Sequence, residues 1–149
     1  MYQASFMNLA LDEANKALEL DEVPVGSVLV LNNKIIGRGH NKVIVSNSPI
    51  KHAEIIAIED ACQKTNNFRL FGADIYTTLE PCHMCAKAIV DARISNVYYG
   101  AYEPKTGAVC SVDRFFEKKH LNHKVNAYGG FQKLKSEKML KKFFKSKRL

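Results

Sequence analysis

Residues 74–85 read DIYTTLEPCHMC, and this stretch decides the fold. Its first half, through Leu79, is rich in β-branched and aromatic residues, which favour a β-strand. Pro81 follows almost at once, and proline is well placed in the first turn of a helix, so we predict a helix from there through Ala92. A strand therefore passes directly into a helix that carries two cysteines near its start.

The segments on either side predict alternating helices and strands. We expect the other helices at residues 4–20, 52–64, 113–118 and 131–147. The other strands are expected at residues 25–31, 34–39, 96–100 and 125–128. Asn32-Asn33 accepts the positive φ of a tight turn, which makes the first two strands a hairpin. Strands that then alternate with helices indicate a layered α/β protein whose sheet is partly parallel.

The composition is that of one ordinary globular domain. The chain has 149 residues, of which 46% are hydrophobic and 25% are charged, and this fits a single domain over residues 1–149. No apolar run approaches the roughly 18 residues that a membrane span needs. Asp12 and Glu13 stand where a signal peptide would be basic and then apolar. We therefore expect a cytoplasmic protein with no membrane partner.

The net charge of +7 is concentrated in the C-terminal part of the chain. Residues 118–149 contain ten lysines, Arg148 and a single acid, Glu137, whereas residues 1–117 carry a net charge of −3. Such asymmetry indicates a polyanionic partner, with nucleic acid ahead of an anionic membrane. On charge alone, a solvated lysine-rich helix face is an equally good interpretation.

Cys82 and Cys85 lie three residues apart, so on a helix they can share a metal ion. Unpaired N–H groups at a helix start stabilise thiolates, the form that binds metal. A Cys-x-x-Cys pair is also typical of a redox centre, so the cysteines alone leave both interpretations open. His83 should point away from such a metal, because adjacent residues lie about 100° apart around a helix.

The helix predicted at residues 52–64 begins at a histidine, and two helix starts can approach each other. The expected core stripe of this helix consists of Ile55, Ile56, Ile58, Ala61 and Cys62. Glu54 follows His52 by two residues, and on a continued helix their side chains would diverge by about 200°. They converge only if His52 belongs to the turn that enters the helix. A glutamate in the first turn is also typical of simple dipole stabilisation.

The sequence resembles the zinc-dependent nucleobase deaminases, whose signature is H-x-E followed by P-C-x-x-C. More narrowly, it is similar to the bacterial tRNA-specific adenosine deaminases through nearly the whole chain. The matching motifs are Val23-Pro24-Val25-Gly26, Gly37-x-Gly39-x-Asn41, His52-Ala53-Glu54, Thr78-Leu79-Glu80-Pro81-Cys82, Gly100-Ala101, Lys105-Thr106-Gly107-Ala108, Asn122-His123 and Phe143-Phe144. The resemblance implies a three-layer α/β/α cytidine-deaminase-like fold, with a central mixed five-stranded sheet flanked by about five helices.

By this resemblance, His52, Cys82 and Cys85 bind one Zn²⁺ per subunit and leave a fourth position to water, whose pKa the zinc lowers. Glu54 is then the catalytic residue, not a ligand: it takes the proton of the water, passes it to the ring nitrogen and assists the loss of ammonia. The expected reaction is the hydrolytic deamination of adenosine to inosine at the wobble position of a tRNA anticodon loop.

The resemblance also implies substrate contacts and partners. Asn41 would lie beside the base, where an amide suits the N6/N7 edge of adenine, although turn chemistry after a strand explains this residue equally simply. The other expected contacts are Val25, Ala53 and Leu79 around the base, and Glu103, Lys105 and Phe144 towards the flanking RNA. Glu103 departs from the family, in which aspartate is commoner at that place. The expected partners are a tRNA anticodon stem-loop and a second subunit in a homodimer.

Two other classes of function share part of this pattern. A deaminase of a free nucleotide or base, such as deoxycytidylate, cytosine or guanine, has both zinc motifs but less use for the basic tail. A non-catalytic, zinc-stabilised RNA-binding module would need a fourth protein ligand in place of water. Phe143 and Phe144 stand among lysines, and this mixture of charge and aromatic rings favours an RNA substrate.

Overall fold

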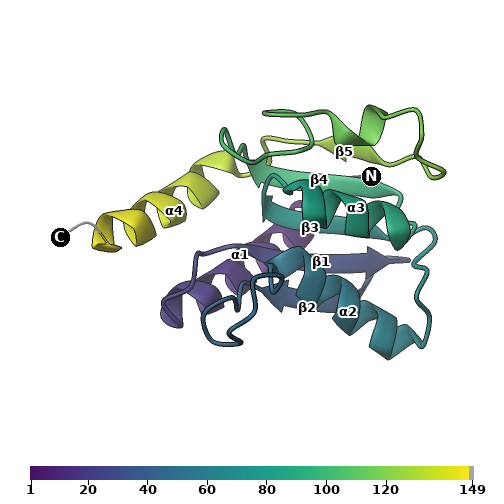
Figure 1. The fold of residues 1–149 in the computed structure, drawn as a ribbon. Helices are drawn as coiled ribbons and strands as arrows, with labels where there is room; N and C mark the ends of the chain where they lie inside the picture. The colour runs from purple at the N-terminus through teal and green to yellow at the C-terminus, as the bar shows by residue number, and fades with distance from the viewer. Residues whose placement is uncertain (148–149) are drawn as a thin grey trace.

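The computed structural model describes residues 1–147, so Arg148, a part of the basic tail, lies outside the described residues. Its centre is one five-stranded sheet in the order β2-β1-β3-β4-β5 (Figure 1). The strands are β1 (Gly26–Leu31), β2 (Lys34–His40), β3 (Asp74–Leu79), β4 (Asn96–Ala101) and β5 (Asn126–Tyr128). β1 pairs antiparallel with β2 and β3, whereas β3, β4 and β5 run parallel. The sheet is therefore mixed, as predicted.

Helices cover both faces of this sheet. They are α1 (Ala4–Glu19), α2 (Ala53–Thr65), α3 (His83–Asp91) and α4 (Lys133–Lys147). α2 and α3 pack together over one face, and α1 and α4 contact each other on the opposite face (Figure 1). The three-layer α/β/α fold is confirmed. Within residues 1–147, no helix has the length and apolar character needed to cross a membrane.

The described residues contain four α-helices where about five helices were expected. The difference lies in the segment predicted as a short helix at residues 113–118, which forms only a 3₁₀ turn, η1 (Phe115–Glu117). The N–H groups of Glu117 and Lys118 donate to the carbonyls of Arg114 (3.0 Å) and Phe115 (3.1 Å), three residues earlier in the chain instead of four. These hydrogen bonds have the 3₁₀ pattern, which is typical of short pieces, so the segment forms one turn and no α-helix.

Alternate residues of each strand point to opposite faces of the sheet, which produces two cores. Ile75 belongs to the core beneath α2 and α3, and the next residue, Tyr76, belongs to the core beneath α1 and α4. Val97 and Tyr98 divide in the same way on β4. The three inner strands, β1, β3 and β4, are buried on both faces, as is usual where helices cover a sheet on both sides, whereas the edge strands β2 and β5 are partly exposed.

The predicted core stripe of α2 is confirmed at Ala61 and, in part, at Ile58 and Cys62, which are half-buried and pack against the core, but it is wrong at Ile55 and Ile56. The buried residues of this helix are Ala53, Glu54, Ala57 and Ala61, whereas its isoleucines are only half-buried. The cause lies on β2, where a Cβ atom built on Gly37 or Gly39 would overlap the backbone of α2. Glycine allows the two backbones to approach closely, and only small side chains then fit between them.

The fold brings the starts of α2 and α3 together beside the carboxyl end of β3. Each helix is preceded by an N-cap residue with extended backbone, His52 (φ −74°, ψ 155°) and Cys82 (φ −78°, ψ 177°). α3 therefore begins at His83, two residues later than the predicted start at Pro81, because its first helical hydrogen bond joins the N–H of Ala86 to the carbonyl of Cys82. His52 lies in the turn that enters α2, which is the condition for it to converge with Glu54.

Candidate active site

His52, Cys82 and Cys85 form a compact group of metal-binding side chains. The Nδ1 atom of His52 lies 3.6 Å from the Sγ atom of Cys82 and 3.5 Å from that of Cys85, and all three ligand atoms lie within 4.8 Å of one another. Zinc–sulfur bonds of about 2.3 Å and a zinc–nitrogen bond of about 2.05 Å, in tetrahedral geometry, would separate nitrogen from sulfur by roughly 3.6 Å. The donor set and its spacing therefore fit a zinc ion.

No other histidine, cysteine or carboxylate joins this group within the part of the chain that the structure describes. His83 is turned away, as predicted, and its Nε2 atom lies 2.9 Å from a carboxylate oxygen of Asp113. The Nε2 atom of His123 lies 2.7 Å from the Ile94 carbonyl. Three protein ligands with a fourth position left open are typical of catalytic zinc, whereas structural zinc has four.

The surroundings of the two thiols shift their pKa values in opposite directions. Hydrogen bonds from Cys85 and His52 lower the pKa of Cys82 to about 4, although burial opposes this. The hydrogen bond with Cys82, together with burial, raises the pKa of Cys85. These surroundings favour the thiolate of Cys82, and the positive charge of a zinc ion would favour the thiolate of Cys85 as well.

Glu54 lies in the first turn of α2 and is only 4% exposed. Burial raises the pKa of its carboxyl group to about 7, and the negative charge of Cys82 acts in the same direction. His52 and Cys85 oppose the shift through the charge of the imidazole and a hydrogen bond from the thiol. The carboxyl group thus adjoins the three-ligand group without belonging to it, and a group that titrates near neutrality can both accept and donate a proton.

Asn41, Ala53 and Val25 are joined by hydrogen bonds beside this group. The Oδ1 atom of Asn41 accepts a hydrogen bond of 2.8 Å from the N–H of Ala53. The N–H of Asn41 donates to the carbonyl of Val25 at 3.2 Å. The side-chain oxygen of Asn41 and the backbone N–H of Ala53 are therefore hydrogen-bonded to each other. This bond connects the residue that follows β2 to the start of α2.

Leu79, Glu103 and Lys105 lie where β3 and β4 end. Leu79 pairs with Ala101 in the parallel ladder, and the chain then turns into an exposed loop that contains Lys105. The Oε1 atom of Glu103 accepts a hydrogen bond of 2.9 Å from the N–H of Lys105. The structure thus places this loop at the same end of the sheet as Cys82.

No role was predicted for Glu80, although it stands in the matching motif two residues before Cys82. Its carboxylate is buried and accepts hydrogen bonds from the loop that contains Lys105. An acidic residue directly before Pro-Cys was the one signal that could have drawn attention to it. Nothing in the local sequence indicates that its donors lie 23 to 31 residues further along.

Phe143 and Phe144 lie on different faces of α4, as expected for adjacent helical residues. Phe143 is 6% exposed and packs inward, whereas Phe144 is 47% exposed. The seven lysines of α4 are all exposed, at positions 133, 135, 138, 141, 142, 145 and 147. This helix extends beyond the sheet at the left of Figure 1. Its exposed lysines and the ring of Phe144 are presented to solvent.

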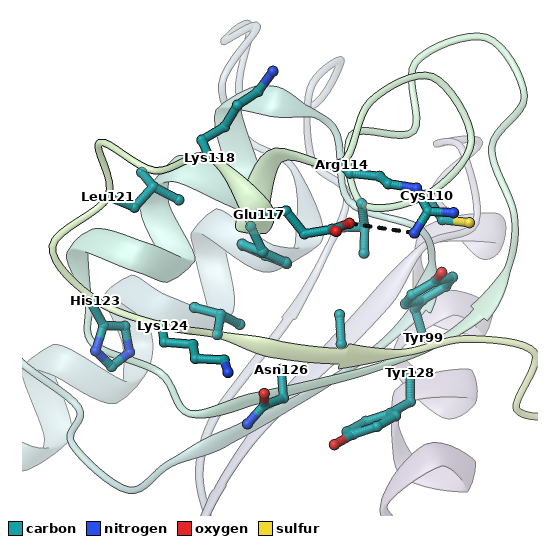
Figure 2. A pocket seen from close by; sticks show the side chains of 14 residues that line it. Tyr99, Cys110, Arg114, Glu117, Lys118, Leu121, His123, Lys124, Asn126 and Tyr128 are labelled. Atoms are coloured by element: carbon teal, nitrogen blue, oxygen red, sulfur yellow. Dashed lines mark hydrogen bonds and ion pairs between the residues drawn. The ribbon is translucent and has the colours of Figure 1, made fainter.

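A hollow of about 650 Å³ lies elsewhere, between β5 and the segment that contains η1 (Figure 2). Arg114 and Glu117, 3.4 Å apart, stand on one side of it, and Asn126 and Tyr128 stand on the other (Figure 2). None of the predicted site residues lines this hollow. It is therefore separate from the three-ligand group.

Residues 2–101 match the family model of the cytidine and deoxycytidylate deaminase zinc-binding region. A tRNA-specific adenosine deaminase of Agrobacterium fabrum is 49% identical, over 97% of this chain and 95% of the relative. A solved structure from studies of A-to-I editing by tRNA:A34 deaminases is 48% identical, with a TM-score of 0.90, and covers 93% of this chain and 100% of that chain. A guanine deaminase from Bacillus subtilis is 32% identical, with a TM-score of 0.66, over 86% and 85% of the two chains.

The family model covers the segments that hold all three metal-binding residues, and zinc binding is part of its definition. The identity to tRNA-specific adenosine deaminases extends over almost the full length of both chains and exceeds that to the guanine deaminase. The chain therefore belongs to the cytidine and deoxycytidylate deaminase family and, within it, to the tRNA-specific adenosine deaminases.

Proposed function

We propose that this protein catalyses the hydrolytic deamination of adenosine to inosine at position 34, the wobble position, of a tRNA anticodon loop. The observation that carries the proposal is a buried carboxylate, Glu54, beside a three-ligand zinc site. The chain that contains this site is 49% identical to a tRNA-specific adenosine deaminase, and the related solved structure belongs to studies of tRNA:A34 deaminases at the wobble position.

His52, Cys82 and Cys85 are the residues that would bind the zinc. One neutral imidazole and two thiolates balance the charge of the dication, and the bound ion would lower the pKa of a water molecule towards neutrality. The N-cap positions of His52 and Cys82 support this assignment, because extended backbone lets both side chains point across the gap between the helix starts.

Glu54 is the proposed general acid and base. Its carboxylate accepts a proton from the attacking water and delivers it to N1 of adenine while the water oxygen bonds to C6. It then carries the second water proton to the amino group, which leaves as ammonia, so that water and adenosine give inosine and ammonia. A pKa of about 7 in a buried site suits a group that must move protons in both directions.

Asn41, Val25, Ala53 and Leu79 are proposed to form the base pocket. Because the Asn41 oxygen already accepts the N–H of Ala53, its amide nitrogen is the group that we assign to the base, where it would donate to N7. Val25 is buried next to Asn41 and supplies an apolar wall. The Leu79 carbonyl at the end of β3 completes the pocket in this proposal.

The flanking RNA is proposed to contact the loop with Glu103 and Lys105 and the exposed face of α4. Phosphate groups attract lysines, and an exposed ring such as Phe144 can stack on an unpaired base. An anticodon loop suits this arrangement because it presents unstacked bases, whereas a base within a duplex cannot reach such a pocket.

We further propose that the single domain acts as a homodimer in the cytoplasm, where tRNA is found and thiolate ligands stay reduced. Three large apolar side chains in the loop before His52 support a protein partner there: Ile44, Val45 and Ile50 are 67%, 59% and 50% exposed. Several large apolar side chains exposed within one short loop are typical of an interaction surface.

One assay separates the candidate functions. The purified protein is incubated with total tRNA, adenosine, cytidine and guanine, and inosine at the wobble position is measured by sequencing together with released ammonia. Inosine in tRNA is the expected result. Ammonia from guanine without inosine in tRNA would replace the proposal with a free-base deaminase, the alternative favoured by the 32% identity to the Bacillus subtilis enzyme. Zinc binding and tRNA binding without either product would identify a non-catalytic module.

A further inference from the structure

Glu80 is a buried carboxylate around which a whole loop is folded. It is 2% exposed. Its oxygens accept hydrogen bonds from the backbone N–H groups of Glu103 (3.1 Å), Val109 (3.1 Å), Cys110 (2.8 Å) and Ser111 (2.9 Å), and from the hydroxyl of Ser111. All five donors belong to residues 103–111, the segment that follows β4.

This arrangement resolves a problem that an isolated buried carboxylate would create. Removing an ionised group from water is costly unless it is paired or well hydrogen-bonded. No salt bridge to Glu80 is present among residues 1–147, so five donors from one loop replace the solvent. Hydrogen bonds to the charged form keep that form stable. The folded conformation of the loop therefore depends on the charged form of Glu80, and the charged form is stable in this buried place only because the loop donates hydrogen bonds to it.

Gly107 shows independently that the loop is built around this carboxylate. A Cβ atom at Gly107 would overlap the carboxyl group of Glu80. The N–H of Gly107 instead bonds to the carbonyl of Glu103 at 2.9 Å, and the N–H of Ala108 bonds to the carbonyl of Pro81 at 2.9 Å. The loop thus closes on itself and on the segment that leads to Cys82.

We propose that Glu80 is a positioning residue that fixes the loop of residues 103–111 against the zinc-binding segment and so sets the place of the nucleotides beside the target base. This inference rests on the proposed function, in which Glu103 and Lys105 face those nucleotides. Glu80 does not belong to the three-ligand group, and the loop encloses its carboxylate. Glu80 acts through the loop, so its loss should weaken the binding of the flanking nucleotides more than it slows the chemical step at the zinc site.

The first test is Glu80→Gln, which keeps the shape of the side chain but removes its charge and turns an acceptor into a donor. Trypsin cleavage after Lys105, which is exposed, reports on the order of the loop without any assay of activity. We expect cleavage to accelerate at least about tenfold while the zinc content stays that of the wild type. With an anticodon stem-loop as substrate, we expect KM to rise at least about tenfold and kcat to change less than about threefold.

Glu22→Gln is the matched control. Glu22 is also a buried carboxylate, 1% exposed, and accepts backbone hydrogen bonds from Ile44 and Val45 in a different loop. It should reproduce any general loss of stability but leave cleavage after Lys105 unchanged. Gly107→Ala disturbs the same contact from the loop side and should also accelerate cleavage after Lys105 and raise KM. This second variant tests the proposal even if Glu80→Gln does not fold.

Wild-type rates of cleavage after Lys105 and an unchanged KM in both variants would overturn the proposal and leave Glu80 with a purely structural role. Failure of the proposed function is a distinct result. If wild-type protein produces no inosine in tRNA, the substrate assignment fails, whereas the protease experiment still decides whether Glu80 orders the loop.

Discussion

The Sγ atom of Cys85 lies 3.5 Å from the Nδ1 atom of His52, although 33 residues separate the two in the chain. This approach depends on two helices that begin at the same end of the sheet, each after an extended N-cap residue. The unfolded chain has no such preformed group of ligands, so zinc binding is coupled to folding.

Cys85→Ser should remove zinc and activity together. A serine hydroxyl stays protonated near neutral pH and is a poor ligand, so only two of the three donors would remain. We expect the zinc content, measured by elemental analysis, to fall from about one per chain to below roughly a tenth of that. Cys110→Ser is the control, because Cys110 is exposed and outside the ligand group. Full zinc occupancy in Cys85→Ser would exclude Cys85 as a ligand.

Glu54→Gln should retain zinc but lose turnover. The amide keeps the size of the side chain and cannot shuttle a proton, and positioned acid–base groups contribute about 100- to 10,000-fold to a rate. Single-turnover deamination of an anticodon stem-loop measures this loss, with elemental analysis of the same sample for zinc. Glu59→Gln on the same helix, where Glu59 is half-exposed and pairs with Lys51, should leave the rate unchanged. Residual activity of Glu54→Gln within about tenfold of wild type would rule out the proposed role.

The stability that Glu80 contributes should decline in acid. Burial alone would raise its pKa, but hydrogen bonds from Ser111, Cys110 and Glu103 outweigh burial and lower the pKa. The contribution is therefore complete above the ordinary glutamate pKa of about 4.3 and is lost as the pH falls through the lower pKa of the folded state. Urea unfolding of wild type and Glu80→Gln should show a constant difference from about pH 7 to about pH 5 and a smaller one below about pH 4. A difference that grows on acidification would contradict a depressed pKa.

The sequence predicted β3 and the zinc-binding segment well because their signals are local. A β-rich run, a proline and two cysteines three residues apart indicate where a strand ends and a helix begins. Only part of the core face of α2 could be found in this way: Ala61, Ile58 and Cys62 were predicted, but Ala53 and Ala57 were not, because the close approach of α2 to Gly37 and Gly39 on β2 is what selects the alanines. Local sequence patterns also could not predict the role of Glu80, because its hydrogen-bond partners belong to a loop that becomes its neighbour only in the folded protein.

Neutralising exposed lysines on α4 should weaken RNA binding and its dependence on salt. Each phosphate contact that is lost reduces the slope of log K against log salt by about 0.7 to 0.9. The double variant Lys141→Gln, Lys145→Gln should therefore reduce the slope by up to about 1.8, measured by titration of an anticodon stem-loop at several salt concentrations. Lys64→Gln on α2 is the control and should leave the slope unchanged, because this exposed lysine pairs with Asp60 near the end of α2 remote from the zinc site. Equal slopes in the wild type, the double variant and Lys64→Gln would show that the exposed lysines of α4 are solvated and do not contact phosphate groups.

Substitution of Phe143 should reduce stability, whereas substitution of Phe144 should weaken RNA binding. Their rings lie 5.2 Å apart at an interplanar angle of 81°, yet only Phe143 is buried. Phe143→Ala should reduce the free energy of unfolding by about 3 kcal/mol, because it removes a buried aromatic ring and leaves a cavity in its place. Phe144→Ala should change stability by less than about 0.5 kcal/mol, as is usual for exposed positions. It should weaken binding of the anticodon stem-loop by about 1 to 3 kcal/mol if its ring stacks on a base, with the salt slope unchanged because no charge is lost. Unchanged affinity in Phe144→Ala would remove this ring from the RNA surface and leave the lysines as the only contacts proposed for α4.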